Sequence, residues 1–125
     1  SGIFNATSTL IYNPDAHVDL FLFEGANELG TVSTSLIFAP DPSTPPLPPD
    51  TIIGVDPLLA ALTNNGGPTR TQAVLPGSVA IDAGANPQSL SFDQRGTGFA
   101  RVVGAAADIG AFEYDPDRIF TNGFE

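Results

Sequence analysis

The sequence predicts an all-β protein built from short strands and many loops. Of its 125 residues, 13 are glycine and 12 are proline, which is about twice ordinary usage. Both residue types interrupt helices and long strands, so this content favours short strands separated by turns. Nine phenylalanines and two tyrosines accompany many aliphatic side chains, and together they are enough to form a hydrophobic core. The length suits a single domain.

Three strands are expected within residues 1–38. Residues 8–12 are β-branched and aromatic, residues 18–24 form a mixed apolar run, and residues 31–38 alternate before becoming apolar. Asparagine, proline and glycine separate the runs, which recur about every 12 to 15 residues. This spacing fits either a β-sandwich or the last rungs of a solenoid, and three short runs do not distinguish the two.

Residues 39–50 contain six prolines in twelve residues, which predicts a polyproline-II spacer. A peptide that docks into an aromatic groove is the alternative interpretation. One short helix is expected at residues 56–62, with Asp56 as its N-cap and Pro57 at its first position. Asparagine and glycine at 64–67 should end it. Short extended segments are expected further along, at residues 73–75, 79–81, 99–103 and 109–114.

The charge of the chain excludes several partners. Fourteen acidic residues accompany four arginines and no lysine, giving a net charge of −10. Such a chain repels phosphates, so we expect no nucleic-acid binding. No run approaches the roughly 20 apolar residues that span a bilayer, so no membrane span is expected. Without cysteine there can be no disulfide, no thiolate metal site and no thiol nucleophile.

Six short motifs follow one another between residues 53 and 114. They are Asp56-Pro57-Leu58-Leu59, Asn65-Gly66-Gly67-Pro68-Thr69, Leu75-Pro76-Gly77-Ser78, Ala80-Ile81-Asp82-Ala83-Gly84, Asp93-Gln94-Arg95-Gly96 and Asp108-Ile109-Gly110-Ala111-Phe112-Glu113. In this order and spacing they resemble the choice-of-anchor Q domain. Two positions depart from that family's pattern, because Gln72 stands where the family often has histidine and Val79 where it often has proline.

The resemblance implies a location more than a chemistry. Members of this family form the C-terminal end of secreted or surface bacterial proteins with right-handed parallel β-helix repeats. It implies that residues 1–38 are the last rungs of such a helix, that 51–114 form a loop-rich cap and that 115–125 are a sorting-type tail. The ending Ile-Phe-Thr-Asn-Gly-Phe-Glu resembles short tails on some exported Gram-negative proteins. The implied partner is the upstream β-helix of a longer parent chain.

Catalysis has little support in the sequence. His17 is the only histidine, and no base or nucleophile accompanies it, so we interpret it as a surface loop residue. A zinc or iron site of the usual kind is not expected, because there is no cluster of histidine and cysteine. No catalytic residue and no cofactor are therefore assigned.

Four acidic residues remain as candidates for a shared site: Asp82, Asp93, Asp108 and Glu113. They could converge as the acid pair of a glycosidase or lyase. We instead expect Asp82 and Asp93 to cap turns and to pair with Arg95 or Arg101. Asp82, Asp93 and Asp108 are also weak candidates for a structural calcium site, although none lies in an EF-hand pattern.

The functional hypothesis starts from the open end of a β-helix. Its last rung has unpaired backbone groups and an exposed apolar core, which invite pairing with another chain. We expect the loop-rich residues to fold over that end. The side chains expected to be buried against the last rung are Leu58, Leu59, Leu62, Val74, Leu75, Ile81, Ile109 and Phe112.

On this hypothesis the chain is a non-catalytic capping and surface-sorting region of a secreted bacterial β-helix protein. The first alternative is an adhesin-like module that pairs its strands with a second copy or with a surface partner. A more distant alternative is part of a polysaccharide lyase or hydrolase, which would need a groove holding two carboxylates within about 10 Å.

Overall fold

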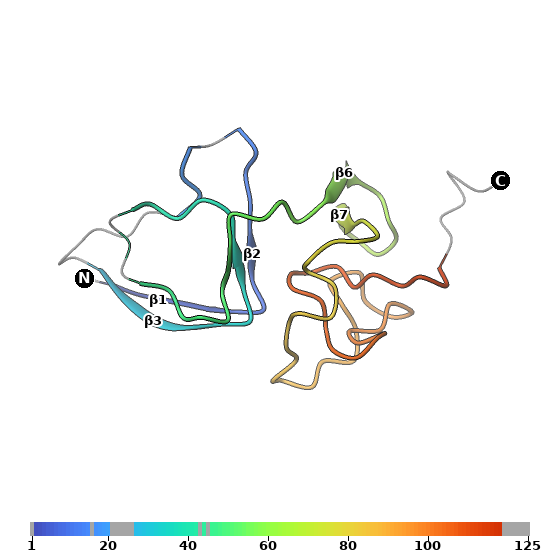
Figure 1. The fold of residues 1–125 in the computed structure, drawn as a ribbon. Helices are drawn as coiled ribbons and strands as arrows, with labels where there is room; N and C mark the ends of the chain where they lie inside the picture. The colour runs from blue at the N-terminus through green and yellow to red at the C-terminus, as the bar shows by residue number, and fades with distance from the viewer. Residues whose placement is uncertain (1, 16, 21–26, 43, 45, 119–125) are drawn as a thin grey trace.

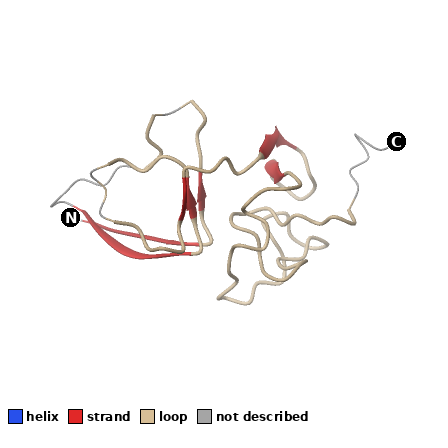
Figure 2. Cartoon of the chain, in the orientation of Figure 1, coloured by secondary structure: helices blue, strands red, loops and turns tan. Residues whose placement is uncertain are grey.

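The computed structural model describes residues 2–15, 17–20, 27–42, 44 and 46–118 (Figure 1). Within these ranges the chain forms short strands joined by turns and loops, and it contains no helix (Figure 2). The expectation of an all-β chain is confirmed. The strands are β1 (Gly2–Thr7), β2 (Leu10–Ile11), β3 (Asn27–Ser33), β4 (Leu36–Ile37), β5 (Ile52–Ile53), β6 (Leu59–Thr63) and β7 (Thr71–Val74). No described segment is a helix that could span a membrane.

Successive passes of the chain run parallel up to Gly54, and we call these residues the first half. β1 pairs with β3, and a second sheet has the order β2-β4-β5. In this second sheet Leu10 lies opposite Leu36, and Leu36 lies opposite Ile52. Paired residues of the first two passes are 25 or 26 positions apart, and those of the second and third passes are 16 positions apart. Similar side chains of successive passes therefore lie next to one another in the sheet.

Equivalent corners join the two sheets in both passes. Ser8 lies between β1 and β2, and Thr34 lies between β3 and β4, with φ angles of 50° and 44° in the left-handed region. Ser35 fixes the second corner, because its buried hydroxyl donates to Ser33 O over 2.8 Å and accepts from Thr9 N over 3.1 Å. The same left-handed corner thus occurs in both passes, and hydrogen bonds between the passes stabilise it.

The β2-β4-β5 sheet is covered on both faces. Neighbouring residues of a strand point to opposite faces, and both Leu36 and Ile37 are completely buried. Ile37 packs with Leu20 inside the first half, where three partly buried side chains join them: Phe4, Ile11 and Leu47. Leu36 points the other way and packs with residues that follow Gly54: Val74, Ala80, Ile109 and Phe112.

Residues 55–118, which we call the second half, therefore lie against the outer face of this sheet. Figure 1 shows them beside β2, on the side away from β1 and β3. Leu10 and Ile52, the strand neighbours of Leu36, pack against the same cluster. The second half thus covers the face of the three-strand ladder, whereas the sequence suggested that it would fold over the end of the stack.

Residues 56–62 form no helix, so that expectation is wrong. Asp56 does cap the local backbone, since its carboxylate accepts a hydrogen bond from Leu58 N over 2.8 Å. Leu58 then adopts a φ of 52°, through which a right-handed helix cannot continue. β6 begins at the next residue, Leu59, and pairs antiparallel with β7, with Leu59 opposite Val74. A segment of seven residues is too short to form a stable helix by itself. The glycine-containing turn that follows reverses the chain, so that the segment can pair with β7.

The expected strands of the first half are shorter in the structure. The run at 8–12 contributes only β2, and the run at 31–38 is divided at Thr34 into the end of β3 and all of β4. In the run at 18–24, Leu20 makes a single parallel bridge to Pro40, and residues 21–24 lie outside the described residues.

In the second half only the segment at 73–75 overlaps a strand, β7. Residues 79–81, 99–103 and 109–114 form turns and loops, apart from one bridge between Phe92 and Ala100. Their apolar side chains suggested strands, but some of their backbone N–H groups bind loop carbonyls, as Arg101 N and Ile109 N do, and others bind carboxylates, as Val103 N and Tyr114 N do.

The proline-rich segment 39–50 lies within the first half. Pro40 bridges to Leu20, and Leu47 packs against the Leu20–Ile37 cluster. β5 follows directly and pairs with β4, so residues 52–53, which we assigned to the loop-rich cap, complete the sheet of the first half. The prolines form a return loop between two neighbouring parallel strands.

The expected core of the second half is found in part. Five of the eight side chains lie in the cluster around Leu36, buried or half-buried: Leu59, Val74, Ile81, Ile109 and Phe112. The other three are 40%, 59% and 40% exposed, so their expected burial is wrong: Leu58, Leu62 and Leu75. Leu58 and Leu62 lie in the segment 56–62, where no helix forms, and Leu75 follows directly after β7.

Candidate functional site

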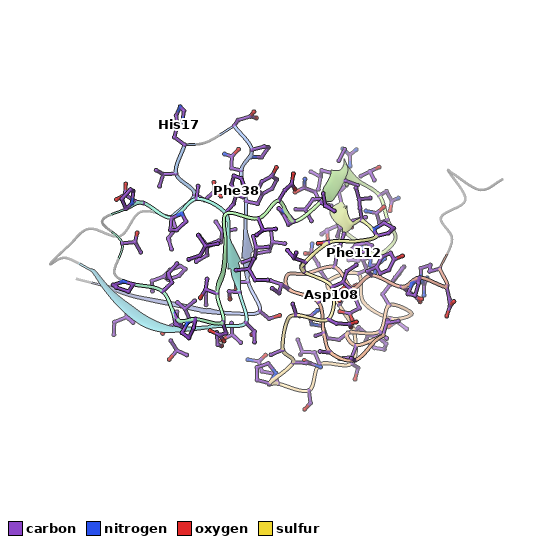
Figure 3. All side chains as sticks on the ribbon, viewed as in Figure 1. His17, Phe38, Asp108 and Phe112 are labelled. Carbon is purple, nitrogen blue, oxygen red and sulfur yellow. The ribbon has the colours of Figure 1, made fainter. Side chains whose placement is uncertain are left out.

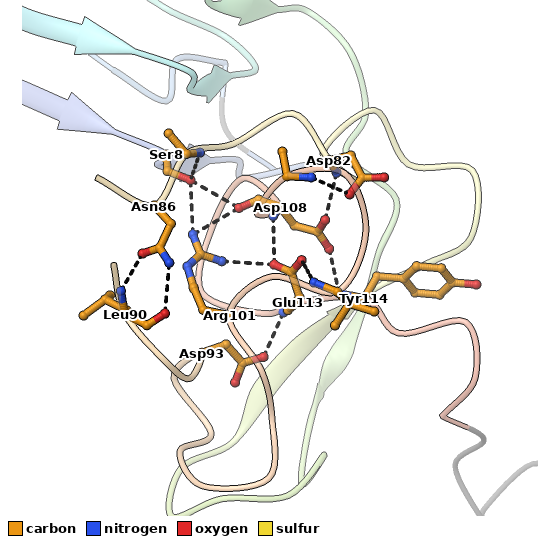
Figure 4. A network of polar contacts seen from close by, with 12 residues as sticks. Ser8, Asp82, Asn86, Leu90, Asp93, Arg101, Asp108, Glu113 and Tyr114 are labelled. Carbon is orange, nitrogen blue, oxygen red and sulfur yellow. Dashed lines mark hydrogen bonds and ion pairs between the residues drawn. The ribbon is translucent and has the colours of Figure 1, made fainter. Parts of the chain in front are cut away.

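A network of buried charged side chains holds the loops of the second half together (Figure 4). Its buried members are at most 7% exposed: Asp93, Arg95, Arg101, Asp108 and Glu113. All of them lie on turns and loops, outside the named strands. Ionisable groups are seldom buried unless they are paired and hydrogen-bonded, so their arrangement decides what this region can do.

Asp93 and Arg95 form the tightest pair of the network. Arg95 Nη2 donates to Asp93 Oδ2 over 2.6 Å, and Arg95 Nε lies 3.1 Å from both carboxylate oxygens. The guanidinium lies between two rings, 4.1 Å from the centroid of Phe99 and 3.8 Å from that of Phe112. The structure thus places Asp93 against one of the two arginines that the sequence suggested, inside an aromatic sandwich.

The Asn65-Gly66-Gly67 motif packs onto this pair. A side chain at Gly66 would overlap the ring of Phe99, and one at Gly67 would overlap the backbone of Arg95. Both glycines have positive φ, 101° and 77°, which glycine adopts without strain. Asn65 Nδ2 donates to Thr71 O over 3.1 Å and so ties the loop to β7. Two motifs that are distant in the sequence therefore meet at Arg95.

Glu113 is the centre of the second part of the network. Its Oε2 accepts from Arg101 Nη1 over 3.3 Å and from Asp108 N over 2.8 Å, and its Oε1 accepts from Val103 N over 3.1 Å. Glu113 also connects to the first part, since its own N–H donates to Asp93 Oδ2 over 2.9 Å. One carboxylate therefore supplies the hydrogen bonds that a neighbouring strand would otherwise provide.

Asp108 acts in the same way on its own neighbours. Its Oδ1 accepts from Asp82 N over 2.8 Å, and its Oδ2 accepts from Tyr114 N over 2.6 Å. Asp82 in turn accepts from Ala106 N over 3.3 Å, and its φ of 58° marks the turn that it caps. Asp82 makes no ion pair with Arg95 or Arg101 in the structure, so only its expected turn-capping role is seen.

Ser8 joins this network to the first half. Its hydroxyl donates to Asp108 O and accepts from Arg101 Nη2 and Ala85 N, each over 3.2 Å. Gly84 lies at the same contact, where a side chain would overlap both Ser8 Oγ and the backbone of Asp108. Our sequence analysis did not single out Ser8. The signal was the repeat of Ser8-Thr9-Leu10-Ile11 as Thr34-Ser35-Leu36-Ile37.

Burial changes the acidity of two carboxyl groups. Removal from water, helped by the nearby Asp108 carboxylate, raises the pKa of Glu113 to about 7, although the hydrogen bonds from Asp108 N and Val103 N and the charge of Arg101 act to lower it. Burial also raises the pKa of Asp108, again against backbone hydrogen bonds, here from Asp82 and Tyr114. Glu113 therefore binds a proton more tightly in the folded chain than in the unfolded one.

Three carboxylates come close enough to be considered as oxygen ligands. One oxygen from each of Asp82, Asp108 and Glu113 lies within 4.8 Å of the others. Of the three calcium candidates from the sequence, the structure brings Asp82 and Asp108 together, whereas Asp93 is paired with Arg95. Arg101 lies against Glu113, and a guanidinium charge so close opposes a bound cation.

The same geometry bears on acid–base chemistry. Two of the three close carboxyl groups, those of Asp108 and Glu113, are 1% exposed and already bind backbone N–H groups. His17 lies on the first half, far from Asp108 (Figure 3). The arrangement is suited to fixing loops, because most of its polar atoms bind one another or the backbone of the loops.

We compared the chain with protein-family models, with curated proteins and with solved structures, and none of them matches it.

Proposed function

We propose that this chain is a non-catalytic region that covers and supports the last strands of a parallel β-helix at a bacterial cell surface. The observation that carries the proposal is the position of Leu36. This side chain lies in the middle of a parallel three-strand ladder and is completely buried by residues of the second half. The first half forms the stack of parallel strands, and the second half covers one face of that stack.

The parallel pairing supports the β-helix part of the proposal. Two passes with a 26-residue step stack Leu10 on Leu36 and Ile11 on Ile37, and both pass through a positive-φ corner. Tyr12 and Phe38 continue this stack outside the strands, with ring centroids 5.1 Å apart. A solenoid is built from such repeats, each of which contacts mainly its neighbours. The third pass is shorter, as expected where a stack ends.

The second half supports the capping part. The outer faces of Leu10, Leu36 and Ile52 would otherwise form an apolar strip exposed to water. At about 25 cal/mol per Å² of apolar surface, covering these side chains contributes more than an exposed ion pair would. Because the cover lies on the face of the sheet, we propose that it acts as a lateral support. The edge of β5 is outside this contact.

The buried network supports a non-catalytic role. Its carboxylates bind the N–H groups of their own loops, and two arginines neutralise Asp93 and Glu113. Four members of the network lie in the motifs that resemble the choice-of-anchor Q domain: Asp93, Arg95, Asp108 and Glu113. The net charge of −10 suits a secreted or surface protein that must stay soluble.

A deletion tests the capping role. We expect the chain without residues 56–114 to aggregate and to bind a hydrophobic dye, because the Leu10–Leu36–Ile52 strip becomes exposed. Size-exclusion chromatography with light scattering measures this.

Two point variants of the full chain test whether the cover acts through specific contacts, because each removes one side chain and no loop. Leu36→Ala should cost about 3 kcal/mol of unfolding free energy. Leu62→Ala, at a side chain that is 59% exposed, should cost less than about 1 kcal/mol.

These results would contradict the proposal in two ways. A deletion variant that remains a soluble monomer would show that the strip needs no cover. Equal effects of Leu36→Ala and Leu62→Ala would show that Leu36 is not enclosed by the second half.

A second candidate is strand pairing with a second copy or a surface partner. The specific observation is that β5 ends the order β2-β4-β5 and carries Ile53, which is 49% exposed. A concentration-dependent rise in molar mass that Ile53→Lys abolishes would support it. A monomer at all concentrations would count against it.

A further inference from the structure

We propose that a groove between the β6-β7 hairpin and the loop 109–112 binds a short extended peptide that carries an apolar side chain next to a carboxylate. The groove has a volume of about 260 Å³. Its floor is apolar and includes Leu10, Val74 and Ile109, while Arg70, Gln72 and Gln94 line its rim. The site is separate from the buried network and from the edge of β5.

Arg70 gives the first argument for an anionic ligand. The other three arginines are engaged inside the protein: Arg95 with Asp93, Arg101 with Glu113, and Arg118 with Gly98 O and the ring of Phe99. Within the described residues Arg70 makes no hydrogen bond and no ion pair, and it is exposed at the groove. An arginine without an internal partner is available to bind a carboxylate in two-point fashion.

The rest of the lining gives the second argument. The chain has fourteen acidic residues, yet no aspartate or glutamate lines this groove. Arg70 is thus the one charged side chain among the residues that line the groove, on a protein with a net charge of −10. Such a contrast favours an anionic group over a cationic or neutral one at this position.

Two glutamines supply acceptors for a peptide backbone. Gln72 Nε2 donates to Ala60 O over 3.3 Å, and Gln94 Nε2 donates to Thr69 Oγ1 over 2.8 Å. These bonds orient both amide groups and leave their carbonyl oxygens to accept N–H groups of a bound chain. Leu62, which is 59% exposed, offers an apolar contact beside them. A volume of about 260 Å³ fits two or three residues of a peptide and excludes a folded domain.

The experiment uses the full chain and two synthetic probes. The first probe is acetyl-Gly-Leu-Phe-Glu with a free terminal carboxylate, and the second is its amidated glutamine counterpart. Amide and side-chain shifts followed by NMR titration report both affinity and location. We expect the acidic probe to shift Leu62, Arg70, Gln72 and Gln94, and to bind at least about tenfold more tightly than the amidated probe.

Variants of the full chain separate the groove from general charge effects. Arg70→Gln should weaken binding of the acidic probe about tenfold and leave the unfolding curve unchanged, because Arg70 holds no other group. Gln88→Glu changes the net charge by the same amount at a different surface, and it should leave binding unchanged. Leu62→Ser should weaken both probes alike, since it removes only the apolar contact.

Three outcomes would overturn the proposal. One is the absence of shifts at these residues with millimolar peptide. Another is equal affinity of Arg70→Gln and the unaltered chain for the acidic probe. The third is a groove that binds an oligosaccharide of glucuronate but neither peptide, which would assign it to acidic glycans.

Discussion

The guanidinium of Arg101 donates a hydrogen bond to the hydroxyl of Ser8 over 3.2 Å, although 93 positions of sequence separate them. Among the described residues, strand pairing occurs within each half, in the sheets β1-β3, β2-β4-β5 and β6-β7 and in two single bridges. The contact between the halves therefore depends on the apolar cluster around Leu36 and on hydrogen bonds such as this one. Single polar side chains at the contact should have measurable effects on stability.

Replacing Ser8 tests this contact directly. Ser8→Ala removes one acceptor from Arg101 and from Ala85 N, so we expect a loss of about 2 kcal/mol in unfolding free energy. Urea denaturation measures the loss. Ser91→Ala, at an exposed serine of the second half, is the control and should stay within about 0.5 kcal/mol of the unaltered protein. If both variants unfold alike, Ser8 does not join the halves.

The Asp93–Arg95 pair should behave as one unit. Arg95→Met leaves a buried carboxylate without its partner and should cost about 3 kcal/mol or more. Adding Asp93→Asn to this variant removes the unpaired charge, so the double variant should be less destabilised than the sum of the two single ones. A double-mutant cycle from urea unfolding gives the coupling. Simple additivity would show that the two side chains act independently.

Stability should fall as the pH rises from mildly acidic to neutral. The pKa of Glu113 is 4.5 in its ordinary state and about 7 in the folded chain, because burial penalises its charge. The folded chain binds the proton more tightly, so this contribution is complete below about pH 4.5 and is lost as the pH rises through about 7. Asp108, whose pKa is also raised, acts in the same direction.

Thermal unfolding between pH 4.5 and 8 checks this prediction. Glu113→Gln should flatten the fall in stability, whereas Asp117→Asn, at an exposed residue, should leave it unaltered. A stability that rises over this interval in the unaltered chain would mean that Glu113 is held ionised by Arg101.

Calcium should have little effect on the folded chain. Asp82, Asp108 and Glu113 lie close together, but Arg101 already supplies a positive charge and backbone N–H groups occupy their oxygens. We therefore expect the melting temperature to stay within about 1 °C when millimolar Ca²⁺ is added or chelated. A clear rise that Asp82→Asn abolishes would instead assign a calcium site to these three carboxylates.

The sequence predicted the strand-rich, helix-poor character of the chain because glycine and proline restrict the backbone locally. It also suggested that Asp93 pairs with Arg95 or Arg101, and in the structure its partner is Arg95. It failed at residues 56–62, where the Asp56-Pro57 signal is shared by helix starts and by tight turns. Only the pairing of Leu59 with Val74 decides between them.

The sequence contains the repeat that forms the ladder, but its step is longer than the 12 to 15 residues at which the apolar runs recur. Leu10-Ile11 and Leu36-Ile37 occupy equivalent places in two passes 26 residues apart, which a search for shorter spacings does not find. The repeat of Ser8-Thr9 as Thr34-Ser35 marks Ser8 as a corner residue, but it does not predict which groups Ser8 binds. Its three partners come from loops whose shape depends on the buried carboxylates of Asp108 and Glu113.

The central claim is that the second half covers the outer face of the β2-β4-β5 ladder. Nuclear Overhauser effects from the Leu36 methyl groups test it most directly. We predict cross-peaks from these methyls to Val74, Ile109 or the ring of Phe112, together with cross-peaks to Leu10 and Ile52. Cross-peaks from Leu36 to the neighbouring strands alone, with none to residues beyond Gly54, would contradict the claim.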